Sequence, residues 1–493
     1  MSNQTKYDSF RQTFPEFVYE KYGYDVQPDG LHIVFKFRIG EDICFQPTAF
    51  IPTRPFLCFE QPKAVLDTLV FNIGMIELVS YWKCTCSPLV RVMCGSLCDG
   101  QVLFWKKLYY NGLGEFIYTN GIHATMEDFM GIECWNESLS DCLSADASKQ
   151  SNVAKGESRE SLLAMPSRAT SRSNTQAIKQ SSNQANYLVP VGGGKDSVVS
   201  LKLLKHASIP LVMNPRGATV GCIEANGQTM DDVIVIQRTI DPLLLTLNSQ
   251  GFLNGHTPFS AMLAFYTLLA SQMSGVANIA LSNEGSANEA TVISNGVNHQ
   301  YSKSLEFEND FRNYVKQYIS PSYNYFSLLR PLSELQIAML FSRLDEFHKV
   351  FRSCNVGSKQ DIWCGHCAKC LFAYIILSPF ISPSRLESIF GKNMLDDDTM
   401  RHEFLQLTGQ SETKPFECVG TLSEVHTALS MTVDRWYANT THLPRLLVDF
   451  APHPPYIPLD TLGADHNVPT ELFESLSDWV STLASFMKNS NHV

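Results

Sequence analysis

Apolar and polar positions alternate along the first part of the chain in a way that is typical of half-buried strands. The runs LHIVFKFRI (31–39) and LVRVMC (89–94) place apolar side chains at every second position, which gives each strand one apolar face. Aromatic residues are frequent throughout this region and can fill a core. The pattern predicts a folded N-terminal α+β domain over residues 1–137.

A second pattern, in which short apolar runs alternate with helix-like segments, begins at Tyr187. Strands separated by helices along the chain indicate a parallel, doubly wound α/β sheet. We assign this sheet to residues 187–420, and we expect a helical C-terminal segment over 421–493. The expected strands are 187–191, 210–213, 232–237 and 276–282, and the expected helices are 197–206 and 258–273.

The segment between these two regions, residues 138–186, has a different composition. It is rich in Ser, Asn, Gln and Ala, and it contains no aromatic residue. Such a stretch cannot bury enough apolar surface to offset the entropy of the chain. We therefore expect a polar, disordered linker here.

Charge and composition narrow the range of partners. A formal net charge of -11 argues against a nucleic-acid partner, because binding a polyanion needs a basic surface. The first residues carry no secretory signal, and the longest apolar run considered, residues 371–381, is short and is interrupted by Pro379. Hence no membrane span is expected. Fourteen cysteines without a signal are typical of a reducing compartment, which predicts a cytoplasmic location.

Three glycines, Gly192, Gly193 and Gly194, lie between the expected strand 187–191 and the expected helix 197–206. Glycine lets the backbone turn sharply and bring its N–H groups against a ligand, and a helix N-terminus adds partial positive charge. The stretch therefore predicts a phosphate-binding turn. The alternative is a tight turn without a ligand.

The residues around the glycines distinguish among types of phosphate loop. A Walker A loop has Ser or Thr directly after its lysine, but Asp196 follows Lys195. A dinucleotide fingerprint has glycine three positions after Gly194, where Ser197 stands. The stretch instead resembles the ATP-pyrophosphatase loop, Ser-Gly-Gly-x-Asp-Ser, with Gly192 at the first position. That resemblance implies that residues 192–197 bind ATP, that ATP is split between its α and β phosphates, and that Asp196 holds Mg²⁺.

Four cysteines in SCNVGSKQDIWCGHCAKC follow the spacing Cys-x(9)-Cys-x-x-Cys-x-x-Cys. Thiolates two residues apart can turn toward one ion, and four of them form a closed tetrahedral site without an open position for substrate. A redox pair needs only two cysteines, and iron–sulfur clusters usually have other spacings. We predict structural Zn²⁺, with His366 as a substitute ligand. The expected ligands are Cys354, Cys364, Cys367 and Cys370.

Seven further segments occur in order with the glycine loop and the cysteines. They are FNIGMIELVSYWKCTCSP (71–88), YYNGLGEFIYTNG (109–121), FLNGHTPFSA (252–261), LSNEGSA (281–287), NHQYSKSLEFE (298–308), YFSLLRPLSELQIA (325–338) and KPFECVG (414–420). Together they resemble the bacterial UDP-N-acetylmuramoyl-L-alanyl-L-glutamate epimerases. The resemblance covers about residues 65–121 and 187–420.

The resemblance implies an isomerase that acts on a UDP-muramoyl dipeptide during peptidoglycan synthesis. The terminal L-glutamate would be converted to D-glutamate through a glutamyl adenylate, with release of AMP and pyrophosphate. Adenylation makes chemical sense, because removal of the α-proton from a free carboxylate would create a dianion. One base would then remove the proton, and an acid would return it on the opposite face.

The proton-transfer groups are predicted from their places in the sequence. Glu284 follows the expected strand 276–282, at the edge where ligands bind in such sheets. We predict that it acts as a base or as a second Mg²⁺ ligand, and the alternative is a structural helix cap. His299 and Lys303 lie in polar loops and are candidates to contact the substrate carboxylates or the adenylate phosphate, although such residues are often structural.

Other candidates stand further away in the sequence. Glu115, together with Lys83, has aromatic and glycine-bearing surroundings, and we predict it as a proton-transfer group from the N-terminal domain. His256 has the same possible roles as His299. The guanidinium fork of Arg330 suits a phosphate or a carboxylate.

Two other functions fit parts of the pattern. Another carboxylate-adenylating enzyme, such as a 7-cyano-7-deazaguanine synthase or an amide-forming enzyme, would share the loop and the cysteines, although about 190 residues precede the loop here. A catalytically silent, zinc-stabilised nucleotide-binding scaffold is the other possibility. Asp196 and Ser197 argue against a scaffold, because mere binding needs no metal ligand at the cleavage position.

Overall fold

The protein is described here by a computed structural model, which covers residues 2–134, 186–205, 207–292, 297–440, 442–452, 454 and 456–490. Residues 138–185 of the expected polar linker lie outside the described residues. The chain is a mixed α/β protein that divides into two compact units. Unit 1 comprises Met1–Gln184, Ile234–Ala277 and Asn309–Asn324; unit 2 comprises Ala185–Val233, Asn278–Glu308 and Tyr325–Val493.

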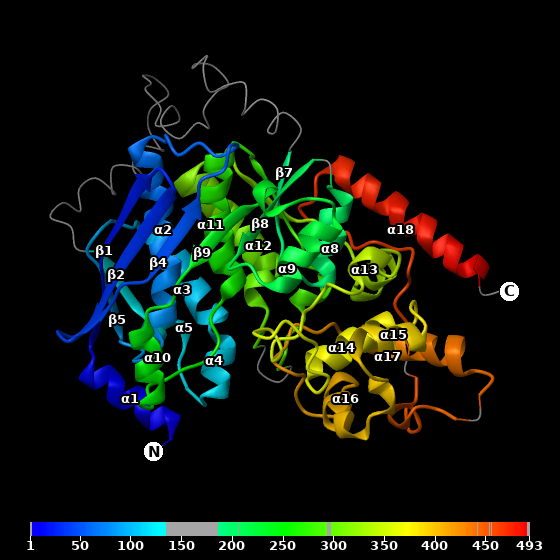
Figure 1. Ribbon diagram of the computed structural model, residues 1–493. Helices are drawn as coiled ribbons and strands as arrows, with labels where there is room; N and C mark the ends of the chain where they lie inside the picture. The colour runs from blue at the N-terminus through cyan, green and yellow to red at the C-terminus, as the bar shows by residue number, and fades with distance from the viewer. Residues whose placement is uncertain are drawn as a thin grey trace, which may run out of the picture. The chain divides into compact units, whose positions relative to one another are not determined.

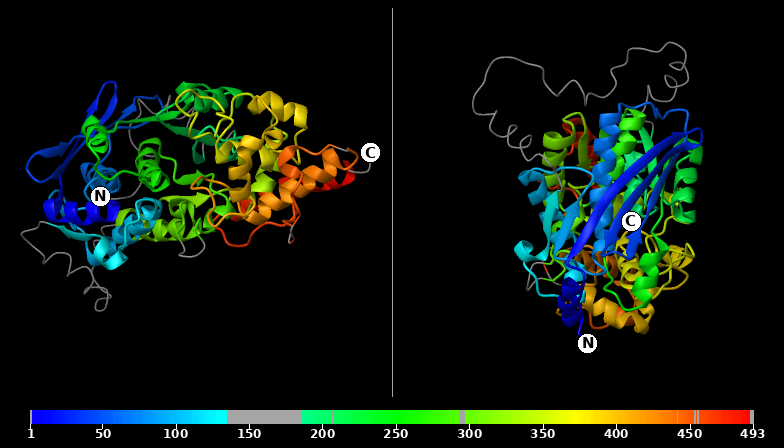
Figure 2. Two further views of the ribbon diagram at one scale, coloured as in Figure 1. Left: turned by 90° about the horizontal axis from the view of Figure 1, so that it is seen from below. Right: turned by 90° about the vertical axis from the view of Figure 1, so that its left-hand side faces the viewer.

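Unit 1 is built on a mixed sheet with the strand order β9-β4-β2-β1-β5-β6, with β3 also paired to β2. The pairs around β2 are antiparallel, whereas β1, β5 and β6 run parallel. Figures 1 and 2 show β1 and β2 as a long blue pair of strands. The strands are β1 (Glu16–Gln27), β2 (Gly30–Ile39), β3 (Ile43–Phe45), β4 (Thr48–Pro52), β5 (Leu89–Val92), β6 (Gly131–Cys134) and β9 (Ile234–Arg238).

The strands expected at 31–39 and 89–94 are confirmed as β2 and β5. Alternate side chains of β2, from Leu31 to Ile39, are buried, as the two-residue period predicts. The helices of unit 1 are α1 (Asn3–Thr13), α2 (Lys63–Trp82), α3 (Asp99–Gly112), α4 (Gly114–Thr119), α5 (Met126–Phe129), α10 (Pro242–Ser249) and α11 (Phe259–Ser274).

The helix α2 forms the centre of unit 1. It packs against β1, β2 and α11, and the ring of Tyr19 from β1 lies so close to Gly74 that a Cβ there would overlap the Tyr19 hydroxyl. The expectation that no run could cross a membrane is wrong by length and composition, because α2 is long enough and apolar enough to do so. However, 83% of its most apolar window is buried inside the protein, which is typical of a core helix.

A buried ion pair fastens β9 to α2. Arg238 Nε and Nη2 donate to the two carboxylate oxygens of Glu77 at 2.6 and 2.7 Å, and the Tyr266 hydroxyl donates to the same carboxylate at 2.9 Å. The expected strand 232–237 is confirmed as β9, which belongs to unit 1 and pairs antiparallel with β4. The expected helix 258–273 is confirmed as α11, and it also belongs to unit 1.

Unit 2 contains a sheet with the strand order β11-β10-β7-β8. Its central pairs, β10 with β7 and β7 with β8, are parallel, which confirms a parallel sheet for this part of the chain. The chain passes from β7 through α8 to β8, so the glycine stretch lies at the carboxyl end of a central strand (Figure 1). The elements are β7 (Tyr187–Pro190), α8 (Lys195–Leu203), β8 (Ser208–Met213), α9 (Gly217–Ala225), β10 (Asn278–Leu281) and β11 (Asn324–Ser327).

The rest of unit 2 is mostly helical. The helices coloured yellow to orange in Figures 1 and 2 form one group, in which α14 contacts α15, α16 and α17. The helix α13 packs against both α8 and α14, so it connects this group to the glycine loop. The helices are α13 (Glu334–Phe341), α14 (Ala368–Leu377), α15 (Pro383–Phe390), α16 (Arg401–Leu407), α17 (Leu422–Thr432) and α18 (Thr470–Ser490); α12 (Leu305–Tyr314) begins in unit 2 and ends in unit 1.

Candidate active site and metal centre

The glycine loop has the backbone geometry of a tight ligand-binding turn. Gly193 has a φ of 85°, in the left-handed region, and a Cβ there would lie 3.1 Å from backbone atoms of Ala218 and Thr219. A Cβ on the exposed Gly192 would meet nothing within 4 Å. Gly194 is the N-cap of α8 and supplies no side-chain cap, which leaves amide groups of the first turn for another partner.

Protein contacts hold the loop in place on its inner side. The carbonyl of Gly193 accepts a hydrogen bond from the amide of Arg352 at 2.8 Å. The hydroxyl of the buried Ser197 donates to the carbonyl of Gly194 at 2.9 Å. Ser197 therefore stabilises the turn in this structure, and its expected contact with pyrophosphate remains a prediction.

Lys195 and Asp196 form part of a buried chain of charges. Lys195 Nζ donates to Asp196 Oδ1 at 2.5 Å and to Glu334 Oε2 at the N-terminus of α13. Burial alone would raise the pKa of Asp196, but Lys195, Lys303 and Lys369 outweigh it and lower that pKa. Asp196 is only half-buried and is held as a carboxylate, which suits an oxygen ligand for Mg²⁺.

Glu334, which was not singled out from the sequence, is the buried partner of Lys195 in this group of charges. Its backbone N–H donates to Glu424 Oε1 at 2.8 Å, while Glu424 Oε2 accepts from the amide of Thr421 at 2.7 Å. Burial raises the pKa of Glu334 to about 8, and the nearby carboxylates of Asp196, Glu284 and Glu424 add to this rise, against Lys195. The cationic Lys195 therefore lies between the carboxyl groups of Asp196 and Glu334 and offsets their negative charge.

Two of the predicted residues, Asp196 and Glu284, act by their negative charge on the ammonium group of Lys303. Burial would lower the pKa of Lys303, but the negative groups of Cys418, Glu284 and Asp196 raise it. Lys303 is accordingly a fixed cation between the loop residue Asp196 and the strand-end residue Glu284. Glu284 is 3% exposed and lies at the start of a short 3₁₀ turn after β10, so the structure places it at the strand end expected from the sequence.

Arg330 is engaged by groups of the protein itself, and its expected contact with a phosphate or a carboxylate of a ligand remains a prediction. Its guanidinium is buried and donates to protein groups: Nη1 to the carbonyl of Glu284 at 2.6 Å, and Nη2 to the carbonyl of Lys303. Nη2 also lies 3.3 Å from Glu308 Oε2, and Glu308 Oε1 accepts from Asn467 Nδ2 at 2.9 Å. Arg330 thus holds together the two segments that carry Glu284 and Lys303.

Cys418 is a further residue at this place that was not singled out. Its Sγ lies 4.0 Å from His299 Nε2, and the positive charge of Lys303 lowers the pKa of its thiol. The backbone carbonyl of Cys418 accepts from Lys369 Nζ at 2.6 Å. The structure therefore brings His299 and Lys303 together, as two loop candidates, around a cysteine that lies 115 residues further along the chain than Lys303.

The predicted residues of the N-terminal region lie in unit 1. Glu115 Oε2 pairs with His256 Nδ1 at 3.1 Å. Lys83 Nζ donates to Thr257 Oγ1 at 2.6 Å and to the carbonyl of Gly255. Burial lowers the pKa of Lys83 to about 8. Glu115, His256 and Lys83 therefore belong to one polar neighbourhood within unit 1, and their roles in catalysis remain predictions.

The four predicted zinc ligands converge on one point. One sulfur each from Cys354, Cys364, Cys367 and Cys370 lies within 4.8 Å of the others. Sulfur–sulfur separations of 3.9, 3.7 and 3.5 Å match a tetrahedron whose metal–sulfur bonds are about 2.3 Å long, as in Zn²⁺ thiolate sites. The donor set and its geometry therefore fit a structural Zn²⁺.

Local structure explains why this cysteine spacing closes around one point. Gly365 has a φ of 73°, which lets the chain turn between Cys364 and Cys367. Cys367 is the N-cap of α14 and Cys370 lies in its first turn. His366 is exposed, and its Nδ1 lies 2.9 Å from the carbonyl oxygen of Cys364. The four cysteines complete the site without His366 as a substitute ligand.

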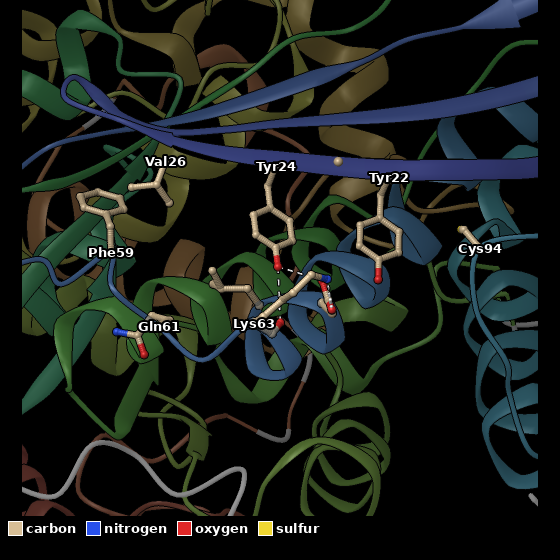
Figure 3. Close-up of a pocket in the computed structure, with 10 residues that line it drawn as sticks. Tyr22, Tyr24, Val26, Phe59, Gln61, Lys63 and Cys94 are labelled. Atoms are coloured by element: carbon tan, nitrogen blue, oxygen red, sulfur yellow. Dashed lines mark hydrogen bonds and ion pairs between the residues drawn. The ribbon is translucent and has the colours of Figure 1, made fainter.

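A pocket of about 580 Å³ in unit 1 does not contain these residues. Figure 3 shows Tyr22 and Tyr24 projecting from β1 toward the start of α2. The Tyr24 hydroxyl donates to Asp67 Oδ1 at 2.8 Å, and Lys63 Nζ pairs with Asp67 Oδ2 at 2.7 Å. The side chains of Tyr24, Asp67 and Lys63 in this pocket therefore pair with one another. The predicted site residues described above do not line it.

The sequence did not single out Glu334, Glu424, Lys369 or Cys418, although Glu334 and Cys418 lie in the family-like segments 325–338 and 414–420 and Lys369 lies within the cysteine cluster. Each lies far from the glycine loop in the sequence, and no local pattern indicates that it approaches that loop. Glu334 follows the helix cap Ser333, and Glu424 reads as a capping-box residue. Their common feature is a buried position next to opposite charges, which depends on tertiary structure.

Comparisons with known proteins agree with this arrangement. The family model described as the MurL N-terminal domain matches residues 9–166 and 157–328, and the MurL C-terminal domain matches residues 350–453. A protein of Xanthomonas oryzae pv. oryzae (strain MAFF 311018) named UDP-N-acetyl-alpha-D-muramoyl-L-alanyl-L-glutamate epimerase is 30% identical over 468 residues, 91% of this chain and 94% of the relative. An epimerase of the same name from Micromonospora sp. (strain ATCC 39149 / NRRL 15099 / SCC 1413) is 35% identical over 304 residues, 59% of this chain and 67% of the relative.

These matches extend the resemblance beyond residues 65–121 and 187–420, since they include residues near the N-terminus and part of the region after residue 420. They confirm the family that the sequence motifs indicated. The chain belongs to the UDP-N-acetyl-alpha-D-muramoyl-L-alanyl-L-glutamate epimerase family, and it is an enzyme of the isomerase class.

Proposed function

We propose that this enzyme converts the terminal L-glutamate of a UDP-N-acetylmuramoyl-L-Ala-L-Glu substrate to D-glutamate, with ATP as the activating co-substrate. The names of the relatives support the substrate and the inversion. The observation that carries ATP dependence is the glycine loop between β7 and α8, with Asp196 and Ser197 in the first turn of the helix. We infer that unit 2 has a fold of the ATP-pyrophosphatase-loop type.

The loop supplies the groups that ATP cleavage between the α and β phosphates needs. Amide groups at residues 192–197 would bind the departing pyrophosphate, helped by the partial positive charge of the α8 N-terminus. The half-buried Asp196 would hold Mg²⁺, which when bound neutralises phosphate charge. Lys195 keeps Asp196 ionised through their 2.5 Å hydrogen bond.

Activation of the glutamate carboxyl group makes the inversion possible. Attack of a carboxylate oxygen on the α-phosphorus forms a glutamyl adenylate and releases pyrophosphate. The α-proton can then leave without creating a dianion, a second proton can arrive on the opposite face, and hydrolysis releases AMP. Lys303 is suitably placed to balance negative charge, because its neighbours are already Asp196 and Glu284.

Each predicted site residue has its own role in this proposal. Glu284 is a base or a Mg²⁺ ligand after β10, while His299 and Lys303 bind the anionic groups of the reacting substrate. Glu115 is the proposed proton-transfer group of unit 1, where it pairs with His256. The four cysteines would hold Zn²⁺ as a structural ion and fix the start of α14.

The proposal predicts a specific isotopic result. The protein is incubated with Mg-ATP and UDP-N-acetylmuramoyl-L-Ala-L-Glu in D₂O, and the glutamate is analysed for deuterium and chirality. We expect deuterium at Cα, D-glutamate, AMP and pyrophosphate. The matched control is α,β-methylene ATP, which cannot be cleaved at this bond and should give neither deuterium nor D-glutamate.

Other results would favour the alternatives. AMP and pyrophosphate without Cα exchange would indicate a different carboxylate-adenylating enzyme, of the nitrile-synthase or amide-forming kind. An absence of ATP cleavage with a protein that still inverts glutamate would reject the role of the loop. A cytoplasmic location remains a prediction, and it agrees with the water-soluble nucleotide substrate that we propose.

A further inference from the structure

We propose that Cys418 is one of the two groups that exchange a proton with the glutamate Cα, acting as a thiolate held between Lys303 and His299. This inference rests on the proposed function, because it assigns a catalytic residue to that reaction. Cys418 lies between α16 and α17, in the segment KPFECVG (414–420), and the family resemblance gives this cysteine no role.

The geometry around the sulfur is that of a stabilised anion. Sγ lies 4.0 Å from His299 Nε2, and the ammonium group of Lys303 acts on it electrostatically. Lys369 is anchored on the backbone carbonyl of the same residue at 2.6 Å. Cys418 as a whole is only half-buried, whereas Cys84, Cys86 and Cys222 are buried.

The charges that face Cys418 explain why its proton is lost at neutral pH. Burial would raise the pKa of the thiol, but Lys303, Lys369 and His299 outweigh it and lower the pKa to about 5. Glu417 is the neighbouring acidic group, and Cys418 contributes to the raised pKa of its carboxyl. The thiolate is the reactive form of cysteine, and positive neighbours of this kind are its usual cause.

Three cysteines outside the zinc-ligand cluster have the opposite environment. Burial raises the pKa of Cys222, of Cys84 and of Cys94 to about 12 in each case. Those three residues are therefore protonated structural thiols. The contrast shows that the surroundings of Cys418 differ from ordinary core burial of a cysteine.

Cys418 also lies close to the groups proposed to bind the activated substrate. Lys303 interacts with Cys418, Asp196 and Glu284, so a single cation connects the thiolate with the glycine loop. A buried acceptor lies next to it: Gln300 is 6% exposed, its Nε2 donates to the carbonyl of Val419 at 3.5 Å, and its Oε1 has no hydrogen-bond partner among the described residues. That oxygen is available for a donor group of the substrate.

The proton-transfer step balances as follows. The Cα–H bond breaks and an S–H bond forms at Cys418, while the electron pair moves into the activated carbonyl group as an enolate. An acid on the opposite face then donates a proton to Cα, and the electron pair returns to form the new C–H bond. Exchange with solvent removes the proton from Cys418 and restores the proton on the opposite acid.

Partial reactions of Cys418→Ser test this assignment. Substrate-dependent exchange of labelled pyrophosphate into ATP reports adenylation, whereas deuterium at Cα and chirality report proton transfer. We expect pyrophosphate exchange within about 3-fold of wild type and net inversion at least about 100-fold slower, the usual contribution of a general acid–base group. Cys44→Ser in unit 1 is the matched control and should retain both activities.

The possible outcomes separate the two proposals. Normal inversion by Cys418→Ser, or loss of both partial reactions in a variant that keeps its wild-type melting temperature, would overturn the role of Cys418. Failure of the wild-type protein itself to exchange pyrophosphate would reject the proposed function instead.

If the variant does not fold, wild-type enzyme is alkylated with iodoacetamide below neutral pH, and the modified site is identified by mass spectrometry. Loss of inversion with retained pyrophosphate exchange supports the proposal, whereas loss of both reactions, or failure to modify Cys418, overturns it.

Discussion

Arg330 donates a hydrogen bond through Nη1 to the backbone carbonyl of Glu284 at 2.6 Å, and both residues are at most 3% exposed. The other end of the same guanidinium contacts the carbonyl of Lys303 and the carboxylate of Glu308. One rigid planar group therefore joins the segment after β10 to the segment that carries the central cation of the site. A lysine in its place could not make this set of contacts, because it lacks the planar fork.

Replacement of Arg330 by Met should destabilise unit 2. Glu308 would keep Asn467 as a partner but lose its buried cation, and removal of one partner from a buried ion pair costs about 3–5 kcal/mol. Urea denaturation measures the loss of unfolding free energy. Arg401→Met, which breaks an exposed pair with Asp398, is the control and should change stability by less than about 1 kcal/mol. Equal effects of the two variants would contradict the role of Arg330.

Asp196→Asn should abolish ATP cleavage while the protein remains folded. The amide keeps the shape of the side chain but removes the negative charge that would hold Mg²⁺ and that pairs with Lys195. We expect pyrophosphate release to fall at least about 100-fold, since the chemistry depends on electrostatic stabilisation of the phosphates. Lys202→Gln on the same helix, which alters a partly exposed pair with Glu346, should leave pyrophosphate release unchanged. A fully active Asp196→Asn variant would show that the loop does not cleave ATP.

Cys367→Ser should lower both zinc content and stability, because three thiolates cannot complete the closed tetrahedral site. The measurement is metal analysis of the purified protein together with its melting temperature. His366→Ala provides a close control, as it removes the neighbouring potential ligand while it leaves all four sulfurs in place. We expect zinc and melting temperature to be retained in His366→Ala. A Cys367→Ser protein with wild-type zinc content would contradict the four-cysteine site.

Glu77→Gln should destabilise unit 1 by about 3–5 kcal/mol, because Arg238 would remain buried without an opposite charge. The double variant Glu77→Met with Arg238→Met should recover part of this loss, since apolar residues avoid the cost of a buried unpaired charge. Lys63→Met, which removes an exposed partner of Asp67, should cost at most about 1 kcal/mol. If the double variant lost more free energy of unfolding than Glu77→Met and Arg238→Met lose together as single variants, this interpretation would be contradicted.

The Cys418 thiolate should also appear in the pH dependence of stability. Its pKa is lowered on folding from 9.0 to about 5, so its contribution to stability is fully present above pH 9 and is lost as the pH falls toward 5. The difference in unfolding free energy between wild type and Cys418→Ser should therefore shrink over this interval. The difference in thiolate ultraviolet absorbance between the same two proteins should titrate near pH 5. A difference that titrates near pH 9 would mean that Cys418 is an ordinary thiol.

Several local features followed directly from the sequence. The alternating pattern of β2, the turn before α8 and the convergence of Cys354, Cys364, Cys367 and Cys370 are all as expected. Each depends on residues close together in the chain, where side-chain period, glycine conformation and ligand spacing constrain the structure. The family resemblance was likewise visible in the order of short motifs.

Tertiary structure alone decided which distant residues meet. Residues 232–237 have the pattern of a strand, but only the packing of Arg238 against Glu77 and the pairing with β4 place that strand in unit 1. Lys303 and Cys418 lie in separate short segments of the sequence, and they acquire their chemistry by lying near each other in the folded protein. Hydrophobic periodicity fixes which side of an element is buried, whereas the charges that shift a pKa come from neighbours that are distant in the sequence, as Lys303 and Cys418 are, 115 residues apart.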